Sequence, residues 1–450
     1  MKTIFRFLSL GLLALALGGF SASAQQPAAT PDPRCADVDG QTALYTTFTE
    51  GYAKKTSAEL KPVLAAGKEF LEKYGACGDA LKDQIAFVQP QVQRIEKLLP
   101  DLDKAEKLKP LFARYDAAIT SDNADEVYAA GKEILSIQPD NLNIMVPMGV
   151  VGLYKSYNKD NKYADDSIRY AKSALDALKS GKSCNKKNKA GEEVCGVLKY
   201  EFMKQNAIDE LSYAVAYLTY YAKADKKGAL PLYYELSQSP GKYKTEPRVY
   251  ATIGGYFGSE IPRLTGEVAK LIARQKGLPT DEEKIKMEPE IKAAIALLNG
   301  YAERAMDGFI RAYSNAKTGT PAEKTYKDGI YKDLTVLYQG RFDKKDGLDS
   351  YIASVTAKPM PNPTLEVTPI ADPEPATTTT TTTTTPVKPA TTGAPAKTAP
   401  AAVVTKPVSD ASPKASADMT GPTKTPSAST VAVKGKPAAK KPVARKKGKG

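Results

Sequence analysis

Apolar residues recur at three- and four-residue steps through most of the chain, which is the spacing of one helix face. The clearest stripe occupies residues 203–222, at Met203, Ala207, Leu211, Ala214, Leu218 and Ala222. Residues 291–313 carry another, at Ile291, Ile295, Leu298, Ala302, Ala305, Phe309 and Ala312. Prolines fall mainly between stripes, as expected of helix boundaries, at Pro110, Pro231, Pro247, Pro279 and Pro321. Since no run alternates as a strand would, we predict an all-α fold built from helical hairpins.

A seven-residue motif occurs twice in the chain. Residues 65–71 and 129–135 both read Ala-Ala-Gly-Lys-Glu-x-Leu, with Phe70 in one copy and Ile134 in the other. The offset of 64 residues is close to two units of about 34 residues, a period typical of one class of helical repeat. Residues 35–358 are more than one compact core usually covers. Two globular halves and an elongated repeat array are therefore both possible architectures.

Small residues recur where the two helices of a repeat would cross. Gly152, Ala164 and Ala171 have the spacings of twelve and seven found in tetratricopeptide repeats, and residues 108–178 resemble that family. The resemblance extends to residues 203–257. Elsewhere it is limited to the general architecture of helical hairpins. Counting forward from Pro139 by the repeat pattern places the first small residue at Gly149 rather than Gly152. We therefore expect the helix that carries these glycines to be about one turn longer than in a standard repeat. An irregular α-bundle is the alternative fold.

The resemblance implies a solenoid that binds protein or peptide partners on its concave face, because each repeat adds area to one surface. On this interpretation the chain is a non-catalytic scaffold. We assign the repeat region to residues 35–358, with residues 25–34 as a short linker before it.

Residues 1–24 have the pattern of a secretory signal peptide. Lys2 and Arg6 precede a largely apolar run, and small residues end the segment at Ala22, Ser23 and Ala24. We expect an exported protein of a bacterial envelope, either periplasmic or extracellular at the cell surface, with no transmembrane helix in the mature chain. An uncleaved membrane anchor is the alternative.

Four cysteines in an exported chain favour disulfides. Proximity along the chain favours the pairs Cys35–Cys77 and Cys184–Cys195. A four-thiolate metal site is the alternative, and the absence of any C-x-x-C motif from the sequence argues against it. We therefore predict no metal.

Residues 359–450 differ sharply in composition from the rest. They hold half of the 32 prolines, an unbroken run of threonine at 377–385, and neither Phe nor Tyr. We predict a disordered tail, because such a segment buries too little apolar surface to offset the entropy of ordering it. Glycosylation of the threonine run is left open.

The end of this tail is strongly basic. Eight positive side chains and no acidic one lie in residues 434–450, at Lys434, Lys436, Lys440, Lys441, Arg445, Lys446, Lys447 and Lys449. Such a cluster binds polyanions by counterion release. We expect it to contact an anionic envelope polymer or membrane surface. No aromatic residue lies between the lysines for base stacking, so sequence-specific nucleic-acid binding is not expected. A solubilising tail without a partner is the alternative.

Histidine is missing from all 450 residues, which excludes His-dependent nucleophilic catalysis and imidazole acid–base chemistry. Carboxylate pairs are the remaining route to catalysis, and the candidates are Asp165/Asp166, Glu192/Glu193 and Glu282/Glu283. Adjacent acids on a helix do not share a face, and these pairs lie among lysines. We predict no enzyme and no cofactor, with a carboxylate-dependent envelope enzyme as the alternative.

Three tyrosines share one predicted helix face. Tyr213, Tyr217 and Tyr220 follow a four-then-three spacing, turned by roughly 100° from the apolar stripe of the same helix. A tyrosine-lined groove suits an extended peptide or a glycan, because each ring is apolar with a polar tip. The alternative is that these rings pack between repeats.

Overall fold

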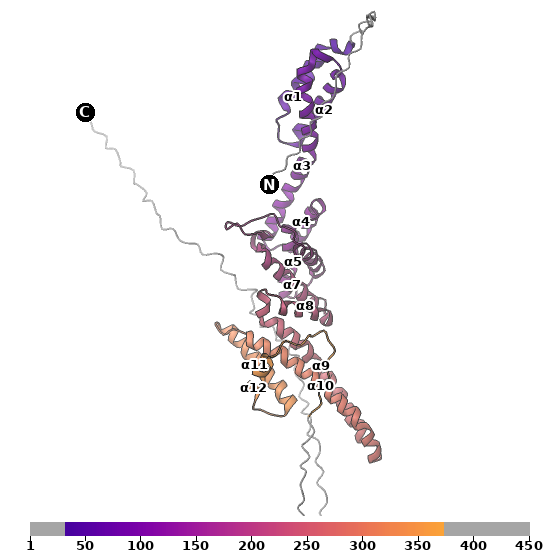
Figure 1. Ribbon diagram of the computed structural model, residues 1–450, viewed down its shortest axis with the longest axis vertical. Coiled ribbons are helices and arrows are strands. Elements are labelled where there is room, and N and C mark those ends of the chain that lie inside the picture. The colour runs from indigo at the N-terminus through magenta and orange to yellow at the C-terminus, as the bar shows by residue number, and fades with distance from the viewer. Residues whose placement is uncertain (1–31, 373–450) are drawn as a thin grey trace, which may run out of the picture. The chain divides into compact units, whose positions relative to one another are not determined.

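The computed structural model describes residues 32–372 (Figure 1). Residues 1–31 and 373–450 lie outside the described part, and with them the predicted signal peptide, the threonine run and the basic cluster of residues 434–450. Within residues 32–372 the fold is helical apart from two strands of two residues each, so the all-α prediction is confirmed. No helix in this part of the chain has the length and apolar character needed to cross a membrane.

The chain divides into two compact units at Pro110. The first unit contains η1 (Pro33–Ala36), α1 (Val38–Gly51), α2 (Ser57–Tyr74), η2 (Gly78–Leu81) and the first part of α3 (Lys82–Thr120). Its core joins α1, α2 and α3 through the fully buried side chains of Phe48, Leu60, Val88 and Ile95. A disulfide joins Cys35 to Cys77, which fastens η1 to the segment after α2.

Pro110 lies inside α3, although the sequence predicts a helix boundary there. Pro231 likewise lies inside α8 (Lys226–Gln238), whereas Pro247 and Pro321 stand at helix starts as expected. Proline removes one backbone hydrogen bond from a helix, but the helix continues when packing holds both flanking turns. Leu108 and Tyr115 are buried on either side of Pro110, which is consistent with this explanation.

The second unit is a succession of antiparallel helices. Its elements are the end of α3, then α4 (Ala124–Ile137), α5 (Leu142–Tyr157), α6 (Ala164–Lys179), β1 (Val194–Cys195), η3 (Leu198–Tyr200), β2 (Phe202–Met203), α7 (Lys204–Tyr217), the π-helical turn η4 (Leu218–Ala222), α8, η5 (Lys242–Thr245), α9 (Pro247–Lys276), α10 (Asp281–Asn315), α11 (Pro321–Phe342) and α12 (Leu348–Thr356). From α4 to α11 each helix packs on the next, and α5 also packs on α7. The second disulfide, Cys184–Cys195, closes the loop before α7.

Helix starts follow local sequence signals. The side chains of Thr280 and Thr320 each accept a hydrogen bond from the backbone N–H three residues later. The carboxylates of Glu283 and Glu323 in turn accept one from the backbone N–H of the capping residue. This capping box satisfies backbone donors that would otherwise have no partner. The long helices α10 and α11 therefore begin where the sequence specifies.

Small residues allow α5 and α6 to pack closely. A Cβ on Gly149 would lie 2.9 Å from the Cα of Ala171, and one on Gly152 would lie 2.6 Å from the Cβ of Ser167. Ser167 Oγ also donates a hydrogen bond to the Gly149 carbonyl at 2.6 Å. Ala164 is buried at the start of α6. Gly152 and Ala171 thus lie at the helix crossing, and Gly149 is the residue that meets Ala171.

Residues 359–372 contain no helix or strand, turn at residues 363–365 and pack on α10; they are here called the C-terminal segment. Its Val367 side chain is buried, and the Ile370 N–H donates to the Ala296 carbonyl at 2.8 Å. The predicted start of disorder at residue 359 is therefore wrong for these residues. Composition alone missed the segment because α10 supplies most of the groups that hold it.

Candidate functional site

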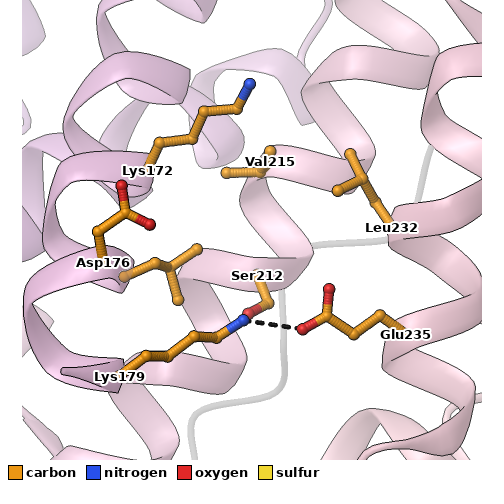
Figure 2. A pocket seen from close by; sticks show the side chains of 8 residues that line it. Lys172, Asp176, Lys179, Ser212, Val215, Leu232 and Glu235 are labelled. Atoms are coloured by element: carbon orange, nitrogen blue, oxygen red, sulfur yellow. Dashed lines mark hydrogen bonds and ion pairs between the residues drawn. The ribbon is translucent and has the colours of Figure 1, made fainter. Parts of the chain in front are cut away.

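A small groove crosses α6, α7 and α8 in the second unit (Figure 2). Helix α6 is amphipathic, with its apolar side toward the core and charged residues at the surface. The groove has a volume of about 120 Å³, and its lining residues are Lys172, Leu175, Asp176, Lys179, Ser212, Val215, Leu232 and Glu235. It combines an apolar floor with a charged rim.

Apolar side chains make the floor of the groove. Leu175 of α6 and Val215 of α7 are buried, while Leu232 of α8 is half-buried. The rim at one end is an ion pair between Lys179 Nζ and Glu235 Oε1 at 2.8 Å, and Lys172 lies at the other end (Figure 2). Both members of the ion pair are about half exposed, so the pair contributes only about 0–1 kcal/mol to stability.

The size of the groove limits what it can hold. Pockets for small-molecule ligands usually measure about 300–1,000 Å³, well above this volume. An apolar hollow of this kind accommodates one anchoring side chain of a partner, and the charged rim pairs with polar groups around that anchor.

The predicted tyrosine groove is not an open surface. Tyr213 and Tyr220 are buried, and Tyr213 stacks on Tyr243 with ring centroids 4.4 Å apart. Tyr217 is half-buried and meets the Tyr157 ring edge-on at 5.1 Å. Burial, as the main cause, raises the pKa of Tyr217 to about 12. Tyr213 and Tyr220 are therefore packing residues, which corrects the partner-binding hypothesis for them.

The helix around these tyrosines explains the correction. Helix α7 packs on α5, α6 and α8, so the face away from its apolar stripe is also covered. After Tyr217 the helix continues as the π-helical turn η4, which changes the angular position of Tyr220 and Tyr221. Helical spacing alone therefore misplaces this face.

The cysteine pairs are disulfides, with Cα atoms 5.5 Å apart in Cys35–Cys77 and 5.3 Å apart in Cys184–Cys195. This is the pairing that proximity along the chain favours. No cluster of metal-ligating side chains occurs in residues 32–372. Near the second disulfide, the Glu193 carboxylate accepts a hydrogen bond from the Cys184 N–H at 2.7 Å. Hydrogen bonds, first from Ser183 and then from this N–H, lower the pKa of Glu193.

One of the carboxylate pairs named from the sequence, Asp165/Asp166, forms surface contacts through both of its members. Asp165 pairs with Lys223 at 2.8 Å, and Asp166 pairs with Lys132 at the same distance. Glu283, from a third pair, caps α10.

Sequence reasoning missed a different pair, Asp209 and Glu210, which are both buried. Asp209 accepts a hydrogen bond from the backbone N–H of Lys242 at 3.1 Å. Glu210 binds the Lys242 ammonium and accepts a hydrogen bond from the Tyr243 hydroxyl at 2.9 Å. These acids hold the segment before α9. Nothing in their spacing distinguishes them from surface acids.

The predicted anionic-surface residues between Lys434 and Lys449 lie beyond the described residues. No protein-family model, curated protein or solved structure matches the chain.

Proposed function

We propose that this protein is an exported, non-catalytic scaffold of a bacterial envelope, built as a tetratricopeptide-like array of helical hairpins. Partners bind by inserting an apolar side chain into the groove of α6, α7 and α8. The basic end of the tail contacts an anionic envelope polymer or membrane surface.

The order of helix packing supports a repeat array. In the second unit successive helices pack on one another, and α5 also packs on α7, two helices further along the chain. Stacked helical hairpins have this pattern, because each unit contacts only its neighbours. The close crossing of α5 and α6 through Gly149 and Ala171 is a second argument for tetratricopeptide-like packing.

The single observation that carries the proposed binding site is the Lys179–Glu235 ion pair across the groove. It joins α6 of one hairpin to α8 of the next, so the groove exists only where two hairpins stack. Binding surfaces of helical arrays are formed in this way.

Two disulfides in the described residues support export, because structural disulfides persist mainly in oxidising compartments. The cluster of eight basic residues supports the tail contact. It also favours a second candidate function, in which the protein acts mainly as a polyanion-binding protein through residues 434–450.

A charge exchange tests the groove. The double variant Lys179→Glu/Glu235→Lys keeps an ion pair but reverses the rim, so the folded protein should unfold at nearly the same temperature. We expect crosslinked capture from the envelope fraction to fall at least tenfold relative to the unmodified chain. If capture is unchanged by the exchange but disappears with salt and on deletion of residues 434–450, the polyanion function replaces the scaffold.

A further inference from the structure

The C-terminal segment is bound to α10 as a peptide is bound to a receptor. Both backbone groups of Ile370 are engaged, since its N–H donates to the Ala296 carbonyl and its carbonyl accepts from Asn299 Nδ2 at 3.1 Å. A Cβ on Gly300 would lie 2.4 Å from the Thr368 carbonyl oxygen. Only glycine at position 300 therefore lets the segment approach α10 this closely.

Buried side chains bind a carboxylate at the C-terminal end of this segment. Asp372 Oδ1 accepts from Arg341 Nη1 at 2.6 Å and from Asn299 Nδ2 at 3.2 Å. Arg341 and Asn299 are only 6% and 7% exposed, and Glu303 orients the guanidinium at 3.0 Å. The Asp372 side chain, in contrast, is 56% exposed. The donors belong to the core of the second unit, while the carboxylate approaches from the surface.

The segment occupies this face without filling it. Among its fourteen residues only Pro363 and Val367 are buried, and Leu365 is 62% exposed. A shallow hollow of about 530 Å³ lies between α10 residues Ala293 and Leu297 and residues 366–369. The contact is thus specific in its hydrogen bonds and small in its apolar burial, which suits an exchangeable ligand.

The sequence contains a second copy of the docked motif. Pro369-Ile370-Ala371-Asp372 matches Pro407-Val408-Ser409-Asp410, with a β-branched residue, a small residue and a carboxylate in the same order. Val-Thr precedes both copies, with Lys406 inserted in the second. No other tetrapeptide in the 450 residues combines Pro, Ile or Val, Ala or Ser, and Asp in this order.

We propose that the face formed by Asn299, Gly300 and Arg341 is a binding site for extended peptides of the form Pro-(Ile/Val)-(Ala/Ser)-Asp. Pro369–Asp372 is its resident ligand, and residues 407–410 of the same chain are its second ligand. When residues 407–410 occupy the site in place of residues 369–372, fewer residues separate the bound copy from the basic cluster that begins at Lys434. This proposal does not depend on the groove of α6, α7 and α8.

Peptide binding to the full chain tests the site. The probe is a fluorescent peptide of residues 404–412, compared with the same peptide carrying Asp410→Asn. In the unmodified chain the tethered Pro369–Asp372 copy competes at high effective concentration, so binding should be weak. Asp372→Asn removes the charge-assisted hydrogen bonds of that copy, and we expect the probe to bind at least tenfold more tightly. The Ile370 amide should then exchange with solvent faster.

Matched variants separate recognition from general effects. Glu288→Gln makes the same charge change at an exposed residue of α10 that does not line the site, and should leave probe binding unchanged. Gly300→Ala should abolish probe binding in the Asp372→Asn background, while improving helix propensity in α10. Circular dichroism and thermal melting establish that each variant is folded.

Three results would overturn the proposal. The first is equal binding of the probe and its Asp410→Asn form, which would mean that the carboxylate is not recognised. The second is no increase in probe binding with Asp372→Asn, whether or not Ile370 exchanges faster. The third is undiminished probe binding with Gly300→Ala.

Discussion

Gly308 of α10 lies directly against Gly254 of α9 where these two long helices cross. A Cβ on Gly308 would be 2.5 Å from the Gly254 nitrogen and 2.6 Å from its Cα. The helices therefore touch through their backbones, and no side-chain movement could relieve a clash there. Because α10 also carries Asn299 and Gly300, this crossing supports the peptide-binding face proposed above.

Gly308→Ala should destabilise the second unit by about 1–3 kcal/mol, because the added methyl group forces α9 and α10 apart. Gly255→Ala is the matched control, since a Cβ at Gly255 meets nothing within 4 Å. Alanine there should be neutral or stabilise the helix by up to about 1 kcal/mol. Denaturant unfolding measures both, and equal effects of the two variants would contradict the crossing.

Tyr213→Ala should lower the unfolding free energy by about 3–5 kcal/mol, as for other large buried aromatic side chains. The loss follows from the stacking on Tyr243 and from burial of the ring. Tyr234→Ala, at a half-buried tyrosine of α8 without a ring contact, should cost about 1 kcal/mol or less. A well-folded Tyr213→Ala protein that had lost only partner binding would restore the tyrosine-groove hypothesis.

The disulfides should act on separate units. The Cys35–Cys77 bridge spans 42 residues in the first unit, and Cys184–Cys195 spans 11 in the second. The chain-entropy treatment assigns them about 4 and about 3 kcal/mol respectively. Calorimetry of the Cys35→Ala/Cys77→Ala and Cys184→Ala/Cys195→Ala proteins should show one transition lowered in each case, and a different one. A single transition lowered equally by both changes would show that the units unfold together.

Alkaline pH should unfold the protein through its tyrosines. Burial, as the main cause, raises the pKa of Tyr200 and of Tyr217 to about 12, against about 10 in an unfolded chain. Between these values the unfolded chain has lost protons that the folded chain keeps, so stability falls as pH rises. Each tyrosine lowers the free energy of unfolding by at most about 1.4 kcal/mol per pH unit in this range, and below pH 10 neither tyrosine lowers it.

Absorbance at 295 nm follows this titration directly, because the chain has 25 tyrosines and no tryptophan. We expect the tyrosines whose pKa is raised by burial, Tyr200 and Tyr217 among them, to titrate late and together with the loss of helical circular dichroism. Titration of every tyrosine near pH 10 with the helices intact would contradict the burial.

The helical architecture can be predicted because the buried face of a helix requires apolar residues at three- and four-residue steps along the sequence. The spacing of Ile291, Ala302 and Phe309 predicts that they share one helix face, and all three are buried. The spacing of Ala171 likewise predicts its packing, since close helix crossing requires small side chains. Such features depend on a residue's own size and spacing, which the sequence states directly.

The remaining features depend on partners that are distant in sequence. The tyrosine face of α7 is buried because α5 and α8 cover it, which periodicity within α7 cannot indicate. The C-terminal segment is ordered because Asn299 and Arg341 bind its backbone and Asp372. The groove of α6, α7 and α8 arises from Lys179 and Glu235 meeting across 56 residues, and no local motif marks either of them.

Site-specific crosslinking tests the scaffold function most directly. A photo-crosslinking phenylalanine analogue would replace Lys172 at the rim of the groove in the full chain, and the exposed Lys324 of α11 in a matched protein. We predict a discrete protein adduct from position 172 in the envelope, absent from position 324, and lost in the Lys179→Glu/Glu235→Lys background. Equal adducts at both positions, or an adduct at 172 that survives the charge exchange, would contradict partner binding at this groove.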